Sequence, residues 1–75
     1  MAIERPLDAL NATRNEFVVA ELKNGKKIRG KLLAFDIHLN LAMDEAEELE
    51  NNEVKRKLGK VLIRGDTIVL IMPSK

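Results

Sequence analysis

Two stretches of alternating apolar and polar residues flank an Asn-Gly pair, and this arrangement constrains the fold of the chain most. The apolar side chains that share one face are Val18, Ala20 and Leu22 before the pair, and Ile28, Leu32 and Ala34, with Gly30, after it. Side chains alternate between the two faces of a β-strand, and Asn-Gly favours the positive φ angles of a type I′ turn. The sequence therefore predicts an antiparallel hairpin with strands at about 16–23 and 26–36, joined at Asn24-Gly25.

A short helix is predicted before the hairpin, at about residues 4–14. Ile3, Leu7 and Leu10 have the spacing of one helix face. Pro6 suits a first helical turn because its fixed φ angle is helical and its missing N–H has no partner there. The segment is therefore expected to be amphipathic.

Three further strands are predicted after the hairpin, at about 40–48, 53–64 and 67–72. Asn51-Asn52 marks an exposed turn between the first two, and Pro73 ends the last. Both faces of the last strand are apolar, which is unexpected at the end of a small sheet unless something covers the second face. We therefore expect a subunit interface along this strand, whose unpaired amides are a template for pairing with a second copy.

Gly30 lies inside the second predicted strand, where a glycine weakens the strand. Such a glycine is typical of a sharp bend or of a close approach by another backbone, as in a small, highly curved barrel. The predicted fold is mainly β: a short N-terminal helix is followed by a strongly bent five-stranded antiparallel sheet. A single domain is expected to cover residues 1–75.

The size of the chain leaves oligomerisation as the expected source of added stability. A domain of 75 residues buries only about 60% of its chain surface. The chain has no Cys and one His, so disulfides are excluded and the ligands of a structural zinc site are missing. The apolar runs are too short to cross a bilayer and the N-terminus lacks a signal-peptide pattern, so we expect a cytoplasmic protein without membrane contacts.

Charge is balanced over the whole chain but uneven along it. Thirteen Lys and Arg against twelve Asp and Glu give a net charge of +1. A basic stretch lies between residues 23 and 31, and an acidic stretch lies between residues 44 and 53. A solvated sheet face explains both stretches more simply than a binding patch does.

The inventory of reactive side chains argues against an enzyme. Cys and Tyr are absent, the only imidazole is His38, and the only hydroxyls are Thr13, Thr67 and Ser74. No hydroxyl stands in a motif that would activate it, and Asp36 two residues before His38 is a weak signal for catalysis. The glycines form no phosphate-binding pattern, so no cofactor is expected.

Two polar loops, at residues 35–40 and 63–66, carry the side chains expected for binding an unstacked base. A histidine ring and a guanidinium can sandwich a base, an asparagine amide can bond to its edge, and an aspartate can fix that amide. The residues concerned are His38, Asn40 and Arg64, with Asp36 and Asp66 as the aspartates. The alternative is that both loops are ordinary turns, in which the aspartates cap the chain and Gly65 supplies a positive φ angle.

These segments resemble the bipartite signature of the Sm and Sm-like (LSm) family, in the style of its archaeal small nuclear ribonucleoprotein homologues. The first part runs from Phe17 to Met43 and includes Gly30 and Asp36-Ile37-His38-Leu39-Asn40; the second is Ile63-Arg64-Gly65-Asp66 with the apolar strand after it. The resemblance implies the Sm fold, a small open barrel. It also implies a ring, heptameric in archaeal members, in which the fourth strand of one copy pairs with the fifth strand of the next.

By resemblance, the family's uridine site maps onto His38, Asn40, Arg64, Gly65 and Asp66. His38 and Arg64 take the two stacking positions, and Asn40 takes the position that recognises the base edge. Asp66 takes the position that supports Asn40, and Gly65 forms the tight turn that brings the base close to the backbone. Asp36 matches a loop aspartate with a structural role.

The sequence thus predicts a non-catalytic RNA-binding protein of a ribonucleoprotein or RNA-processing complex. It is expected to form a homo-oligomeric ring that binds short single-stranded, uridine-rich RNA around a central pore, one base per subunit, without a cofactor or metal. The alternative is a small β-barrel scaffold module that binds protein partners through its exposed strand edge and acidic loop. Convergence of His38, Asn40 and Arg64 on one cleft would favour the RNA-binding hypothesis.

Overall fold

One short helix and five strands make up the part of the chain that the structure, a computed structural model, describes, residues 5–74. The elements in chain order are α1 (Pro6–Asn11), β1 (Phe17–Leu22), β2 (Lys27–Phe35), β3 (Leu41–Glu50), β4 (Glu53–Ile63), the 3₁₀ turn η1 (Gly65–Thr67) and β5 (Ile68–Pro73). All pairings in the sheet are antiparallel. The predicted mainly β class, with a short helix followed by a five-stranded antiparallel sheet, is confirmed.

Helix α1 ends at Asn11, earlier than the sequence pattern predicts. The side-chain hydroxyl and the backbone N–H of Thr13 both donate to the carbonyl of Leu10, at 2.8 and 3.0 Å. These bonds satisfy a carbonyl at the helix end and close the last turn. The predicted helix start at residue 4, and Ile3, lie outside the described residues. Within residues 5–74, no helix has the length and apolar character needed to span a membrane.

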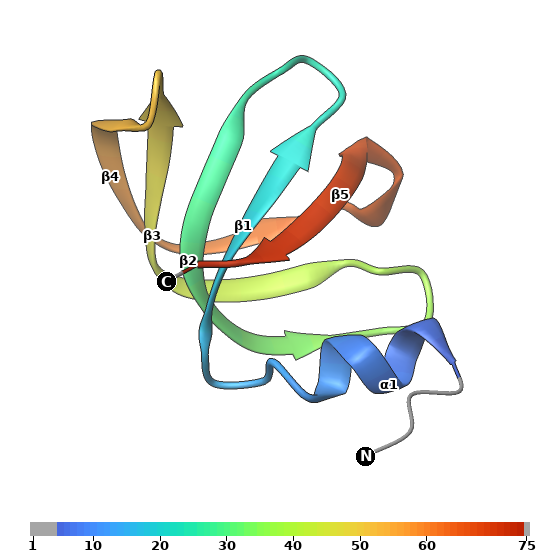
Figure 1. Cartoon of the computed structure of the whole chain (residues 1–75). Helices are drawn as coiled ribbons and strands as arrows, with labels where there is room; N and C mark the ends of the chain where they lie inside the picture. The colour runs from blue at the N-terminus through green and yellow to red at the C-terminus, as the bar shows by residue number, and fades with distance from the viewer. Residues whose placement is uncertain (1–4, 75) are drawn as a thin grey trace.

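The sheet is open and strongly bent. Its strand order is β4-β3-β2-β1-β5, so β4 and β5 form its two edges. Figure 1 shows α1 at one end of the sheet and the β1–β2 and β3–β4 turns at the other. A Cβ atom added to Gly30 would lie 3.1 Å from the Cα of Ala46 and 3.1 Å from the carbonyl oxygen of Asp44. The register between β2 and β3 shifts beside it, between Arg29 and Lys31, so the glycine permits close backbone approach at the bend, as predicted.

The turn type expected at Asn24-Gly25 is wrong. In this turn only Gly25 has a positive φ angle, 86°, and its N–H donates to the carbonyl of Leu22 at 2.9 Å. The side chain of Asn24 accepts a bond from the N–H of Lys26 at 3.0 Å. The loop is therefore a tight turn followed by one left-handed glycine. Type I′ geometry is found instead between β3 and β4, where Asn51-Asn52 has φ angles of 53° and 65°.

The core lies on the concave side of the bent sheet and is closed at one end by α1. Its buried apolar residues are Leu10, Val18, Ala20, Ile28, Leu32, Leu41, Met43, Ala46 and Ile63. Ala34 was expected on the same face as Leu32 but is exposed, because the β2–β3 register shifts between these two residues. The irregularity reverses which side chains face inward at the end of β2.

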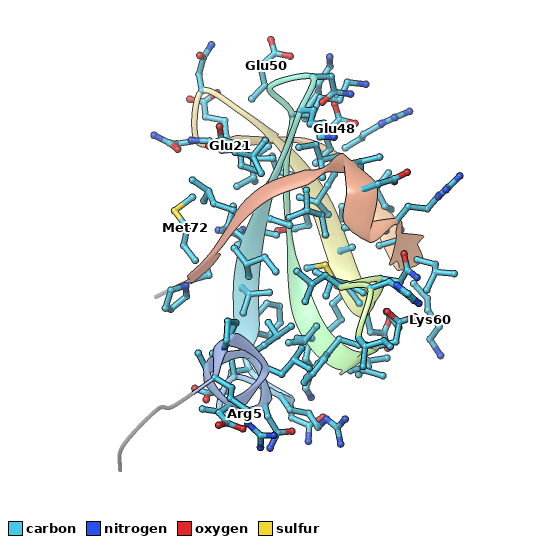
Figure 2. All side chains as sticks on the ribbon, turned by 90° about the vertical axis from the view of Figure 1, so that its right-hand side faces the viewer. Arg5, Glu21, Glu48, Glu50, Lys60 and Met72 are labelled. Carbon is cyan, nitrogen blue, oxygen red and sulfur yellow. The ribbon has the colours of Figure 1, made fainter. Side chains whose placement is uncertain are left out.

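The acidic stretch contains a buried carboxylate, which the sequence pattern does not predict. Glu48 is only 3% exposed and accepts a hydrogen bond from Nε of Arg56 at 2.9 Å. The ammonium groups of Lys26 and Lys55 each lie 4.0 Å from its other oxygen. Figure 2 places Glu48 at the hairpin end of the sheet, far from Arg5 and the helix. Three cations, Lys26 of the β1–β2 turn and the neighbouring Lys55 and Arg56 of β4, thus hold this end of the sheet together.

Replacing Glu48 with glutamine is expected to lower the Tm at neutral pH and to make stability less sensitive to acid. The hydrogen bond from Arg56 lowers the pKa of Glu48, partly opposed by burial and assisted by the charges of Lys26, Arg56 and Lys55. A lowered pKa in the folded state contributes stability above the unfolded pKa, and this contribution is lost as pH falls through the folded pKa. Thermal unfolding followed by circular dichroism at pH 7 and at about pH 3 measures the effect. Glu16→Gln, at an exposed site, is the control. A Tm deficit of Glu48→Gln that is equally large at both pH values would contradict this role.

Both edges of the sheet expose apolar side chains. On β5, Val69 is 57% exposed and Leu70 is 41% exposed, while on β4 Leu62 is 74% exposed. Residues of β5 and α1, together with Leu39, line an apolar groove of about 370 Å³. In Figure 2, Met72 of β5 and Lys60 of β4 project to opposite sides of the molecule. Apolar side chains of the last strand are therefore left exposed within one chain.

Candidate functional site

The loop between β2 and β3 is folded around the carboxylate of Asp36. Its Oδ1 accepts hydrogen bonds from the backbone N–H of His38 at 2.8 Å and of Asn40 at 3.1 Å. Its Oδ2 accepts a bond from Nδ2 of Asn40 at 3.0 Å. The N–H of Leu39 donates to the carbonyl of Asp36 at 3.0 Å, which completes the turn. One aspartate thus positions both the backbone of the loop and the side chain of Asn40.

Gly65 brings the β4–β5 connection into contact with this loop. Its N–H donates to Oδ1 of Asn40 at 2.8 Å. A Cβ atom at this position would overlap the carbonyl oxygen of His38 and would lie 2.8 Å from the carbonyl carbon of Leu39. The glycines with a positive φ angle are Gly25 and Gly59, not Gly65. The alternative interpretation of Gly65 as a turn glycine with positive φ is therefore wrong. A glycine is needed here because the two backbones lie too close together to leave space for a Cβ atom.

The orientation of the Asn40 amide is fixed because both of its ends are bonded. The oxygen accepts from the N–H of Gly65, and the nitrogen donates to the carboxylate of Asp36. Turning the amide over would place its NH₂ group against an N–H and its oxygen against a carboxylate, so both bonds would be lost. One N–H and one oxygen lone pair remain free. Asn40 therefore offers a donor and an acceptor to a ligand in one fixed order.

The charge of Asp36 secures this orientation. The side-chain hydrogen bond from Asn40 lowers the pKa of Asp36; desolvation opposes this, and the backbone bonds from Asn40 and His38 lower it further. The carboxyl group therefore stays ionised at neutral pH and acts only as an acceptor. An ionised Asp36 can accept the NH₂ group of Asn40 but repels its carbonyl oxygen.

Asp66 has a different role from the one implied by the resemblance. Its Oδ2 accepts a hydrogen bond from the guanidinium of Arg64 at 3.3 Å, whereas the bond to the Asn40 side chain comes from Asp36. The expectation that Asp66 supports Asn40 is therefore corrected. The position of Asp36 at the start of a turn, where an Asx side chain bonds to the backbone two residues on, is the sequence signal for its supporting role.

All five predicted site residues line one open cleft between the two loops. The cleft has a volume of about 450 Å³, and its lining consists of His38, Asn40, Arg64, Gly65 and Asp66. The side chains of Arg64 and Asp66 are 79% and 65% exposed, and Asn40 is half-buried at the base of the two loops. A ring and a planar guanidinium beside a fixed donor and acceptor suit a flat heterocycle. Among residues 5–74, no three His, Asp or Glu side chains are grouped so that they could hold a metal ion.

A short helix, an open bent sheet of five strands and a cleft between the β2–β3 and β4–β5 loops define the class of Sm-fold proteins. The sequence model of the LSM domain matches residues 8–73, and the chain belongs to this family. A protein of Archaeoglobus fulgidus, named as Sm-like and snRNP-related, is 50% identical over 70 residues, which cover 93% of this chain and 91% of that protein. The predicted archaeal-type Sm-like membership is confirmed.

Solved structures of archaeal proteins have the same fold. One is the Sm protein of Pyrococcus abyssii in complex with a uridine heptamer, with a TM-score of 0.89 and 41% identity over 95% of this chain and 100% of that chain. Another is the SmAP1 heptamer of P. aerophilum, with a TM-score of 0.88 and 30% identity over 99% of both chains. These similarities confirm the Sm fold predicted from the sequence.

Proposed function

We propose that this chain is a non-catalytic subunit of a ring that binds single-stranded, uridine-rich RNA, one base in each cleft. The observation that carries the proposal is the fixed amide of Asn40 beside His38 and Arg64 in one cleft. The similar Pyrococcus abyssii protein was solved with a uridine heptamer, and the similar P. aerophilum protein was solved as a heptamer. These relatives support uridine as the base and seven as the number of subunits.

Asn40 selects uracil through the order of its free donor and acceptor. Its N–H donates to O4 of uracil, while its oxygen accepts from N3–H. Cytosine presents the opposite order, with an NH₂ group in place of O4 and a bare nitrogen in place of N3–H. Because Asp36 and Gly65 prevent the amide from turning over, Asn40 cannot adapt to cytosine.

His38 and Arg64 supply the faces against which the base stacks. A guanidinium is planar and weakly hydrated, so it packs on a base better than an ammonium group does. Asp66 accepts a hydrogen bond from Arg64 and thereby restricts where its guanidinium lies. Stacking on a side chain contributes about 1–3 kcal/mol per base, so one cleft alone binds weakly.

A ring makes these weak sites effective together. The strands β4 and β5 are the two edges of the open sheet, so β4 of one copy can pair with β5 of the next. Each further base of a bound RNA then meets its cleft at a high effective concentration, which raises overall affinity by ~10²–10⁴. A chain of net charge +1 can bind a polyanion in this way because the Arg64 cations are repeated around the ring.

The scaffold alternative receives less support from the contacts of the acidic stretch. Glu47 accepts a hydrogen bond from Arg29 at 2.6 Å, and Glu50 pairs with Lys55 at 3.0 Å. With Glu48 also surrounded by cations, these carboxylates are engaged within the sheet. They are therefore poorly available as an acidic surface for a protein partner.

Oligo-uridine is expected to bind at least ~10-fold more tightly than oligo-cytidine of the same length, since each mismatched edge leaves polar groups of Asn40 unpaired. Fluorescence anisotropy at one fixed salt concentration measures both affinities, and native mass spectrometry counts subunits and RNA molecules in the complex. Asn40→Ala should remove the preference, whereas Asn11→Ala, on the exposed surface of α1, should keep it. Equal affinity of the wild-type protein for both oligonucleotides would show that Asn40 does not recognise the base.

A further inference from the structure

Leu39 belongs to both the polar cleft and the apolar groove. Its backbone lies between His38 and Asn40, in the loop that forms one wall of the cleft, and its carbonyl carbon lies where Gly65 packs. Its side chain lines the apolar groove with residues of α1 and β5. Binding in the polar cleft and burial of the apolar groove therefore both affect Leu39.

The backbone of Leu39 has a conformation that its side chain disfavours. Its φ angle is 62°, in the left-handed region that glycine and asparagine enter more readily than leucine does. Such a conformation persists where the surrounding structure holds it. Within one chain, the hydrogen bond to Asp36 holds the backbone from one side, but the side chain remains 37% exposed. Contacts that bury this side chain would stabilise the loop further.

We propose that Leu39 is a positioning residue that couples ring closure to uridine binding. A second copy that covers the apolar groove holds Leu39, and Leu39 then holds His38 and Asn40 in the arrangement that binds the base. The inference rests on the proposed function and extends it, because each cleft becomes fully ordered only in the ring. A second copy is the fitting occupant because both edge strands of the open sheet, β4 and β5, lack a partner on one side and expose apolar side chains, with Leu62 of β4 74% exposed and Val69 of β5 57% exposed.

The coupling must be reciprocal. If the ring binds the base more tightly than the single chain does, the base must shift single chains towards the ring by the same factor. A long RNA cannot test this, because it tethers several subunits and favours the ring without any coupling. Uridine monophosphate fills one cleft at a time and therefore reports the coupling itself.

Saturating uridine monophosphate is expected to lower the chain concentration at which half of the rings dissociate by about 5-fold or more. Analytical ultracentrifugation over a dilution series measures this concentration, with cytidine monophosphate as the control ligand. No shift with uridine monophosphate, in a protein that binds oligo-uridine, would overturn the coupling and leave the proposed function intact. Failure of the wild-type ring to bind oligo-uridine would overturn the proposed function itself.

Two substitutions at Leu39 separate its backbone from its side chain. Leu39→Asn tolerates the left-handed conformation but loses the apolar contact. It should therefore weaken the ring and retain affinity for uridine monophosphate. It should also reduce the effect of this nucleotide on the concentration at which the rings dissociate. Leu39→Ala keeps the disfavoured backbone and loses the contact, so it should weaken both ring and binding. Ile37→Ala, in the same loop at a side chain 77% exposed, should change neither. Equal loss of nucleotide affinity in the Asn and Ala variants would contradict the positioning role.

Discussion

Gly65→Ala is expected to abolish detectable oligo-uridine binding while the sheet remains folded. The added Cβ would overlap the carbonyl oxygen of His38, and a backbone atom cannot move aside as a flexible side chain can. The two loops must therefore separate, which breaks the bond between the N–H of Gly65 and Asn40. Because the same change occurs in every subunit, the losses multiply, and we expect affinity to fall by ~100-fold or more.

Gly25→Ala is the matched control for this variant. Gly25 has a φ angle of 86° but no atom within 4 Å of an added Cβ, and it lies in the β1–β2 turn, outside the cleft. Its replacement should cost about 1 kcal/mol of stability through backbone strain while leaving RNA affinity unchanged. Fluorescence anisotropy gives the affinities, and circular dichroism confirms that both variants fold. Wild-type affinity in Gly65→Ala would mean that contact between the loops is not needed for binding.

Val69→Pro is expected to convert the proposed ring into single chains at micromolar concentration. Val69 is 57% exposed on the edge strand β5, and the β1–β5 register passes from Leu70 to Ile68 without pairing it. Proline there removes an N–H and fixes φ, which disturbs the outward edge more than the pairing with β1. Loss of the ring should also reduce oligo-uridine affinity by ~10²–10⁴ through loss of avidity.

Val69→Ala distinguishes the backbone effect from the side-chain effect. It keeps the N–H and removes only part of the apolar contact, so the ring should weaken but still form. Multi-angle light scattering measures the mass of each variant, and circular dichroism shows whether the proline variant keeps its sheet. A Val69→Pro protein that retains the mass of the wild-type oligomer would contradict pairing through β5.

The order of elements could be predicted from the sequence because each strand carries its own local signal. Ala20 and Leu22 alternate with Glu21 and Lys23, and Gly30 marks the bend without any information from distant residues. The turn types could not be assigned in this way. Asn24-Gly25 and Asn51-Asn52 both permit type I′ geometry. The turn type that forms depends on the length of the loop, and the register of the flanking strands fixes that length.

The sequence predicts which residues line the cleft, but it does not predict which aspartate supports Asn40. The two loops carry Asp36 and Asp66, either of which has the chemistry to hold an asparagine amide. The choice depends on the compact turn around Asp36, which places its carboxylate on Asn40 four residues later. The burial of Glu48 could not be predicted from the sequence either, because its cations come from a turn and a strand that only the folding of the sheet brings together.

The bend at Gly30 has a consequence for the geometry of assembly. Two complementary but different edges form a head-to-tail contact, which generates either a closed ring or an endless filament according to the rotation between successive copies. In the proposed ring, the angle between β4 and β5 sets that rotation, and the curvature of the strands between these edges sets the angle. In the proposed ring, the bend at the buried Gly30 thus influences the number of subunits from inside each subunit.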